Sequence, residues 1–129
     1  MGYYTDYDLE VVDCADLELE DIEAAALEIE TDYGEELVGQ LLQGNGYNCK
    51  WYDHEKDMRL LSLKCPDVLF RLKGNGDEEG DIWVKYFKNG LMQECRAKIT
   101  FDEFDDGKME KWLQTLINAK IQRNDHARM

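Results

Sequence analysis

The stretch IWVKYFKNGLMQECRAKITF, residues 82–101, decides the fold. Its centre, Asn89-Gly90, is the dipeptide most typical of a type I′ turn, because both residues tolerate a positive φ. From Leu91 to Phe101, apart from Met92 and Gln93, apolar or small side chains alternate with polar or charged ones, which is the period of a strand with one face in water. We therefore predict a β-hairpin with strands over 82–88 and 91–101.

The chain before and after this hairpin predicts a mixed α+β protein. Apolar periodicity and capping residues define the other elements. We expect strands at 3–13, 47–52 and 68–73, helices at 17–31, 35–43 and 53–64, an acidic turn at 74–81, and a C-terminal helix that begins at Asp105 or Asp106 and carries an apolar stripe over 109–120.

The predicted order is β-α-β-α-β-β-β-α, with the two helical pieces at 17–31 and 35–43 counted together. Such an order fits a mainly antiparallel sheet with helices on one face. The arrangement that we expect is ferredoxin-like with an added hairpin strand. The length of 129 residues predicts one domain over 1–129.

Charge is the most informative property of the composition. The formal net charge is −14, and residues 1–49 hold 14 acidic residues and no Lys or Arg, whereas residues 50–129 hold 15 of each sign. A block of one sign makes a directional field. It repels nucleic acid and anionic membranes and attracts basic surfaces, so we expect neither of the first two as a direct partner.

The sequence also bears on location and cofactors. No stretch approaches the 18 or so uncharged apolar residues of a membrane span, and the first residues lack the regions of a signal peptide, so we expect a cytoplasmic protein. The four cysteines form no C-x-x-C pair, and we interpret them as small buried hydrophobes. We expect no metal and no cofactor.

Three catalytic or binding motifs are considered and set aside. An EF-hand loop aligned on Gly80 would need a glutamate where the chain has Tyr86. A Cys49 or Cys65 nucleophile paired with His54 is the enzyme alternative, which we rank last, because His54 fits better as a helix N-terminal residue half in contact with the core. A basic, aromatic sheet face for RNA would use these side chains, whose charges neighbouring acids cancel: Arg71, Trp83, Lys85, Tyr86, Lys88, Arg96 and Lys98.

Residues 52–101 resemble small ferredoxin-like proteins encoded by phages and plasmids. The likeness rests on Trp51-Tyr52-Asp53, on Leu61-Ser62 before 66–70, on the acidic turn before Asp81-Ile82-Trp83, and on the hairpin 86–90. What it implies is an origin in a mobile element. Small acidic phage proteins include anti-restriction and anti-CRISPR inhibitors that mimic DNA. The families that it resembles are mostly of unassigned function, so no site residues carry over.

These observations predict a protein-binding inhibitor, not an enzyme, that occupies the basic nucleic-acid-binding surface of a host protein. Carboxylates would stand in for phosphates, and tyrosines beside them would add binding energy. The predicted contact charges are Asp6, Asp8, Glu10, Glu18, Glu20, Asp21, Glu23, Glu28 and Glu30, with a second patch of Asp77, Glu78, Glu79 and Asp81. The alternative is a small-ligand or cation-binding module, with a homodimer formed through an open sheet edge.

Overall fold

The computed structural model of the chain describes residues 2–29 and 34–109. The chain divides into two compact units, Met1–Ile99 and Thr100–Met129, which we describe separately. The first unit contains the sheet and the helices. The expectation of one domain over 1–129 stays a prediction.

The first unit has the α+β content that the sequence predicts. Its elements are β1 (Thr5–Asp13), α1 (Leu19–Ala26), α2 (Gly34–Leu42), β2 (Tyr47–Cys49), α3 (His54–Lys64), β3 (Leu69–Gly76), β4 (Ile82–Lys88) and β5 (Leu91–Arg96). The strands form one sheet in the order β2-β1-β3-β4-β5, and every neighbouring pair is antiparallel.

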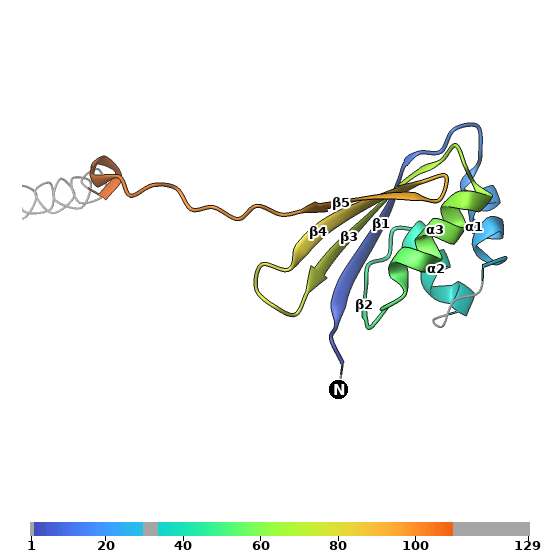
Figure 1. Cartoon of the computed structure of the whole chain (residues 1–129), viewed down its shortest axis with the longest axis horizontal. Helices are drawn as coiled ribbons and strands as arrows, with labels where there is room; N and C mark the ends of the chain where they lie inside the picture. Colours follow the sequence, from blue (N-terminus) through green and yellow to red (C-terminus); the bar gives the residue numbers. More distant parts are fainter. Residues whose placement is uncertain (1, 30–33, 110–129) are drawn as a thin grey trace, which may run out of the picture. The chain divides into compact units, whose positions relative to one another are not determined.

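Helices α1, α2 and α3 lie together on one face of this sheet, and no described residue of the first unit covers the other face, which we call the uncovered face (Figure 1). An antiparallel sheet with helices on one face is therefore confirmed. The strand order does not confirm the ferredoxin-like arrangement. Strands β2 and β3 flank β1 and are joined through α3, while β3, β4 and β5 follow one another as a meander.

The β4–β5 hairpin is built as its turn dipeptide requires. Asn89 and Gly90 have φ values of 49° and 77°, which is the positive-φ pair of a type I′ turn. Strand β4 has its predicted bounds, but β5 ends at Arg96 and not at residue 101. The ladder stops because its last hydrogen bond, from Ala97 N to Ile82 O at 2.8 Å, reaches the first residue of β4.

The predicted turn at 74–81 begins too early. Gly74 belongs to β3, where it lies opposite Trp83. A Cβ atom at Gly74 would lie 2.2 Å from a ring atom of Trp83, so the indole occupies the space over this backbone. Glycine is needed here for a close approach inside a strand and not for a turn, and the acidic turn proper begins at Asp77.

The core lies between the sheet and the helices. Its fully buried side chains include Ile22 from α1, Leu41 from α2, Leu61 from α3 and Phe70 from β3. The four cysteines are all free. Burial is confirmed for Cys49 and Cys65, whereas Cys14 is exposed and Cys95 is partly exposed.

Of the second unit, the structure describes residues 100–109. All of them are exposed, and a helical turn covers 106–109. Asp105 caps this turn, because Gly107 N donates to its carboxylate at 2.9 Å. The apolar stripe predicted over 109–120 lies outside the described residues beyond Met109.

Candidate acidic interface and a buried polar network

The acidic residues of β1 lie on the uncovered face of the sheet and are partly compensated there. Asp6, Asp8 and Glu10 are exposed, as the alternation predicts. Arg71 lies opposite Glu10 in the ladder and places a guanidinium nitrogen 3.7 Å from its carboxylate. Lys73 lies opposite Asp8. This group therefore lies in a surface of both signs and not in a purely negative one.

Helix α1 presents a second group of acidic residues, and among the described residues no Lys or Arg forms an ion pair with Glu20 or Glu23. Its N-cap is Glu18 and not Asp16, and the Asp21 carboxylate accepts a hydrogen bond from Glu18 N at 3.0 Å. Glu20 is exposed and Glu23 is half-buried. Two of the predicted contact charges, Glu18 and Asp21, thus hold the start of the helix, and Glu20 and Glu23 are the acidic residues of α1 that take no part in the capping box.

The two ends of α1 add exposed apolar side chains to this charge. Leu19 and Leu27 are 43% and 55% exposed, although leucine is usually a core residue. Glu28 lies just beyond the helix and is 3.1 Å from Lys64 Nζ. Glu30, another predicted contact, lies outside the described residues.

The acidic turn after β3 holds the N-terminal segment. Tyr4 N donates to the Asp77 carboxylate at 3.0 Å, and the Tyr3 hydroxyl donates to the Asp81 carboxylate at 2.6 Å. The hydrogen bond from Tyr3, followed by that from Arg96, lowers the pKa of Asp81. Asp77 and Asp81 are therefore engaged within the chain.

The other two acidic residues of the turn, Glu78 and Glu79, are exposed. The turn adjoins the Thr5 end of β1, where Thr5 pairs with Gly76, whereas α1 follows the Asp13 end. The predicted contact charges consequently form three groups, on the uncovered face, on α1 and on the turn, and not one continuous surface.

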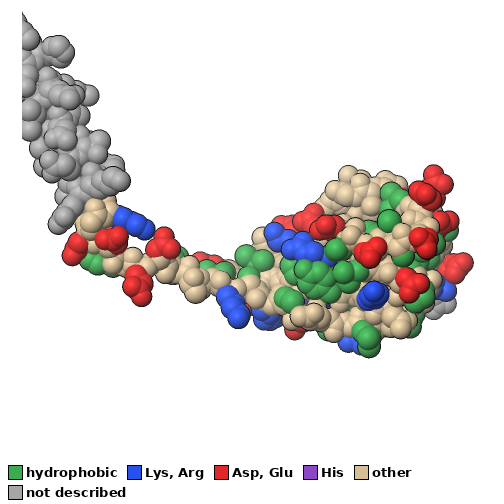
Figure 2. Space-filling model, turned by 90° about the horizontal axis from the view of Figure 1, so that it is seen from above, with side chains coloured by type: hydrophobic (Ala, Val, Ile, Leu, Met, Phe, Trp, Pro, Cys, Tyr) green, Lys and Arg blue, Asp and Glu red, His purple; other side chains and the backbone are tan. Residues whose placement is uncertain are grey.

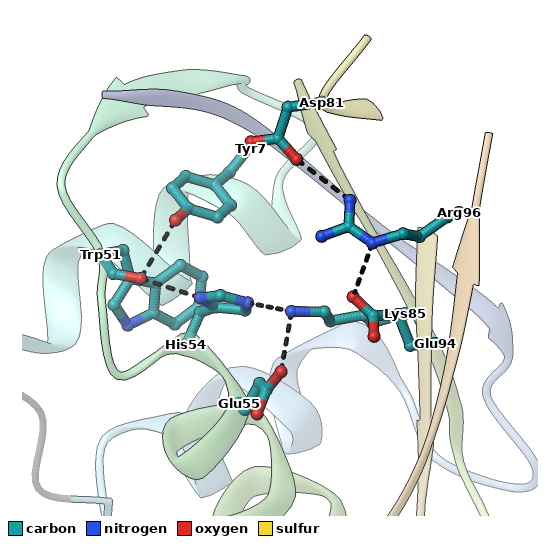
Figure 3. A network of polar contacts seen from close by, with 8 residues as sticks. All are labelled: Tyr7, Trp51, His54, Glu55, Asp81, Lys85, Glu94 and Arg96. Carbon is teal, nitrogen blue, oxygen red and sulfur yellow. Dashed lines mark hydrogen bonds and ion pairs between the residues drawn. The ribbon is translucent and has the colours of Figure 1, made fainter. Parts of the chain in front are cut away.

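A buried polar network lies between α3 and the sheet (Figure 3). The backbone oxygen of Trp51 accepts hydrogen bonds from the Tyr7 hydroxyl at 3.0 Å and from His54 Nδ1 at 2.9 Å. Lys85 is only 5% exposed, and its ammonium group donates to His54 Nε2 at 2.7 Å and to Glu55 Oε1 at 2.8 Å. The lysine is thus a buried cation held by two side chains of α3.

These contacts fix the charge state of His54. A carbonyl oxygen only accepts, so Nδ1 carries the proton, and Nε2 accepts from Lys85 as the unprotonated nitrogen. Burial lowers the pKa of His54, and the charge of Lys85 acts in the same direction. The hydrogen bond from Lys85 lowers the pKa of Glu55. The network is therefore a neutral histidine bound to a lysine–glutamate ion pair.

Trp83 completes the network. Its ring stacks on that of His54, with centroids 4.9 Å apart and an interplanar angle of 15°, and Lys85 Nζ lies 4.1 Å from its centroid. Lys85, Trp83 and Phe87 share the helix-covered face of β4. The basic, aromatic sheet face that the sequence analysis set aside does not form, because Trp83 and Lys85 are buried on the opposite side from Tyr86.

The sequence reasoning missed this network, although one signal for it was present. Alternate residues of a strand share a face, so Lys85 had to lie between Trp83 and Phe87 in the core. A buried cation then requires an acceptor nearby. Asp57, which accepts a hydrogen bond from the Trp51 indole at 2.7 Å, is a second buried charged residue that the helix pattern did not reveal.

The Cys–His arrangement considered from the sequence has no geometric support among the described contacts. Both ring nitrogens of His54 are engaged by Trp51 and Lys85. Burial raises the pKa of Cys49 and of Cys65, which favours the thiol over the reactive thiolate. Within residues 2–29 and 34–109, no group of three or more His, Cys, Asp or Glu side chains is placed to hold a metal ion.

One surface hollow bears on the small-ligand alternative. It has a volume of about 480 Å³ and lies beside the β4–β5 turn, where Leu69, Tyr86 and Leu91 contribute apolar walls and Lys88 and Gln93 polar ones. The volume is within the range of ligand pockets. Small-ligand binding nevertheless stays a prediction.

No family model, no curated protein and no solved structure matches this chain. None of the described helices is both long enough and apolar enough to span a bilayer.

Proposed function

We propose that this protein is a binding protein that occupies the basic nucleic-acid-binding surface of another protein, with α1 and the loop before it as the main contact. The observation that carries the proposal is the charge of residues 13–28, which include seven acidic residues and no Lys or Arg. A surface of this kind steers a basic partner towards it and repels nucleic acid.

The local structure supports this choice among the three acidic groups. Ile22 and Ala26 are buried and anchor α1 on the core, so the outward carboxylates stand on a fixed backbone. The exposed Leu19 and Leu27 offer apolar area beside them. Charge alone gives on-rate, whereas apolar contact at the centre of an interface gives affinity.

The surface view agrees with a directional charge distribution. On the face that Figure 2 presents, acidic side chains predominate at one end of the α+β unit, and Lys and Arg side chains lie among apolar ones nearer the other end. The class of protein that the proposal names is the inhibitor that a phage or plasmid directs against a host restriction or CRISPR nuclease, acting in the cytoplasm. The net charge of −14 and the likeness of residues 52–101 to mobile-element proteins support that class.

The test compares two variants with the same net charge. Glu20→Lys/Glu23→Lys reverses two outward carboxylates of α1 and leaves the cap residues Glu18 and Asp21 intact. Glu78→Lys/Glu79→Lys reverses two exposed carboxylates of the distant turn. Each pair changes the net charge of −14 by four units, so a difference between them reports position and not total charge. The immobilised chain and both variants are exposed to a bacterial lysate at low salt, and the retained proteins are purified and tested singly.

The proposal expects a nucleic-acid-binding protein that the wild type and the turn variant retain, that the α1 variant loses, and that free DNA or RNA releases. A purified partner that binds both variants equally, or that nucleic acid does not displace, would overturn it. Circular dichroism of each variant shows whether α1 is still folded.

A further inference from the structure

The edge of the sheet at β5 is open to pairing. Within the described residues, β5 pairs with β4 alone and ends the strand order. Natural edge strands usually carry a proline, a bulge or an inward charge that prevents pairing. Strand β5 (Leu91–Arg96) has neither a proline nor a break in its register with β4, and the two charges on its inward face, Glu94 and Arg96, are of opposite sign. The opposite edge strand, β2, has only three residues.

The hydrogen-bond pattern shows which groups of β5 point outward. In an antiparallel pair, alternate residues exchange hydrogen bonds with the neighbouring strand. Ala97 N bonds to Ile82 O, so Cys95 and Gln93, which share its parity, also face β4. The backbone groups of Met92, Glu94 and Arg96 consequently point away from the sheet and are available to another strand.

The charge of this edge differs from that of the whole chain. Residues 82–99 include four basic residues and one acidic residue. The acidic strand β1 is separated from β5 by β3 and β4, which is about 14 Å at the usual strand spacing. Exposed charges at that distance are screened at physiological ionic strength, where the Debye length is about 8 Å. Two copies can therefore approach through this edge in spite of their net charge.

A second copy of this chain fits the edge in one register better than in its neighbours. Two antiparallel copies of β5 related by a twofold axis place residues of equal parity opposite one another. An axis at Glu94 would oppose two glutamates, and an axis at Arg96 would oppose two arginines. An axis at Cys95 places Glu94 of each copy opposite Arg96 of the other, so both cross-strand pairs are of opposite sign.

The same register covers exposed apolar side chains. With residues 97–99 continuing β5 in the dimer, it places Leu91 of one copy opposite Ile99 of the other, and these residues are 71% and 56% exposed in the single chain. It also places the two Cys95 residues opposite each other at a site without backbone hydrogen bonds, where Cα atoms are about 4.5 Å apart. That separation is within the range of a disulfide.

We propose that two copies of this chain join their sheets through antiparallel β5 strands, with the twofold axis at Cys95 and reciprocal Glu94–Arg96 pairs. The inference is independent of the proposed function, because it uses the edge farthest from β1 and no residue of α1. The short edge predicts a reversible dimer that forms with increasing concentration.

The first experiment tests the register by oxidative cross-linking of the full chain in a Cys14→Ser background, which removes the other exposed thiol. A mild oxidant should link the chains through Cys95 by joining two thiols with loss of two hydrogens to the oxidant. A matched variant, Gln93→Cys with Cys95→Ser, moves the thiol by one position on the same face. It should remain monomeric on a denaturing gel, because Gln93 is opposite Ala97 in this register.

The second experiment tests the charge pairs by sedimentation equilibrium over a concentration series. Glu94→Arg alone and Arg96→Glu alone should each weaken dimerisation by about tenfold or more, because each opposes like charges twice. All of these variants carry Asp81→Asn, because Arg96 lies 3.3 Å from the Asp81 carboxylate of its own chain and a glutamate at position 96 would face that carboxylate. The exchange Glu94→Arg/Arg96→Glu should then restore dimerisation, and circular dichroism checks the fold of each variant. A chain that stays monomeric throughout the series, equal cross-linking at positions 93 and 95, or an exchange variant no better than the single ones would overturn the inference.

Discussion

The strongest stability prediction concerns the buried ion pair between Lys85 and Glu55. The Lys85 side chain is 6% exposed, whereas the Glu55 side chain is 46% exposed, and Lys85 Nζ lies 2.8 Å from Glu55 Oε1. Removal of Lys85 is therefore not equivalent to removal of Glu55. Lys85→Met removes the buried charge, but Glu55→Met leaves that charge buried with only the neutral His54 and the Trp83 ring beside it.

The magnitudes follow from this asymmetry. Breaking a buried pair so that one charge is left uncompensated costs roughly 3–5 kcal/mol. Because Glu55 is half-exposed, its pair with Lys85 should lie at the lower end of this range. We therefore expect Glu55→Met to lower the free energy of unfolding by about 3 kcal/mol. We expect Lys85→Met to lower it by about 1 kcal/mol, because the lost hydrogen bonds are offset by the desolvation that the lysine no longer suffers.

Urea unfolding of the wild type, both single variants and the double variant measures the coupling. In the Lys85→Met background, Glu55→Met should cost less than about 1 kcal/mol, since only its interaction with the N-terminus of α3 remains to be lost. Equal costs for the two single variants that add in the double variant would refute the reasoning. In that case Lys85 would not be a buried cation that depends on Glu55.

Three further predictions concern pH, packing and thiol reactivity. The pKa of His54 is lowered on folding, so the contribution of His54 to stability is complete above pH 6.5 and falls as the pH decreases from there towards the folded pKa. His54→Gln should therefore flatten this part of a stability–pH profile. An unchanged slope would contradict the neutral histidine. Gly74→Ala should destabilise the fold by roughly 2 kcal/mol, because the Trp83 indole beside it must move. Gly39→Ala, which has open space around its Cβ position, should stabilise the fold by about 0.5–1 kcal/mol. The same sign for both variants would refute the packing argument. A native-state thiol reagent should label Cys14 much faster than the two buried cysteines, and equal rates would contradict their burial.

The local signals of the sequence predicted most of the elements. Asn89-Gly90 determined the hairpin, because few other dipeptides accept two positive φ values. The alternation in β1 placed Tyr7 and Leu9 inward and Asp8 outward, as observed. These features depend on neighbours in the chain, which is why a single sequence reveals them.

The features that were missed depend on residues far apart in the chain. Gly74 resembled a turn residue because its partner, the Trp83 ring, belongs to the next strand. Lys85 meets His54 across 31 positions, and no spacing rule joins a residue of β4 to the first residue of α3. The division of the acidic residues into three groups likewise follows from the sheet order, because Asp77 and Glu20 adjoin opposite ends of β1.

The central claim is that the carboxylates of α1 bind a basic nucleic-acid-binding surface, and the salt dependence of affinity tests it most directly. The dissociation constant for the purified partner is measured by titration at increasing salt, for the wild type and for Glu20→Lys/Glu23→Lys. The account predicts affinity that falls steeply with salt in the wild type, because exposed charges are screened over about 8 Å at physiological ionic strength, and a shallower dependence in the variant. An affinity that is almost independent of salt, or the same slope for both proteins, would contradict it.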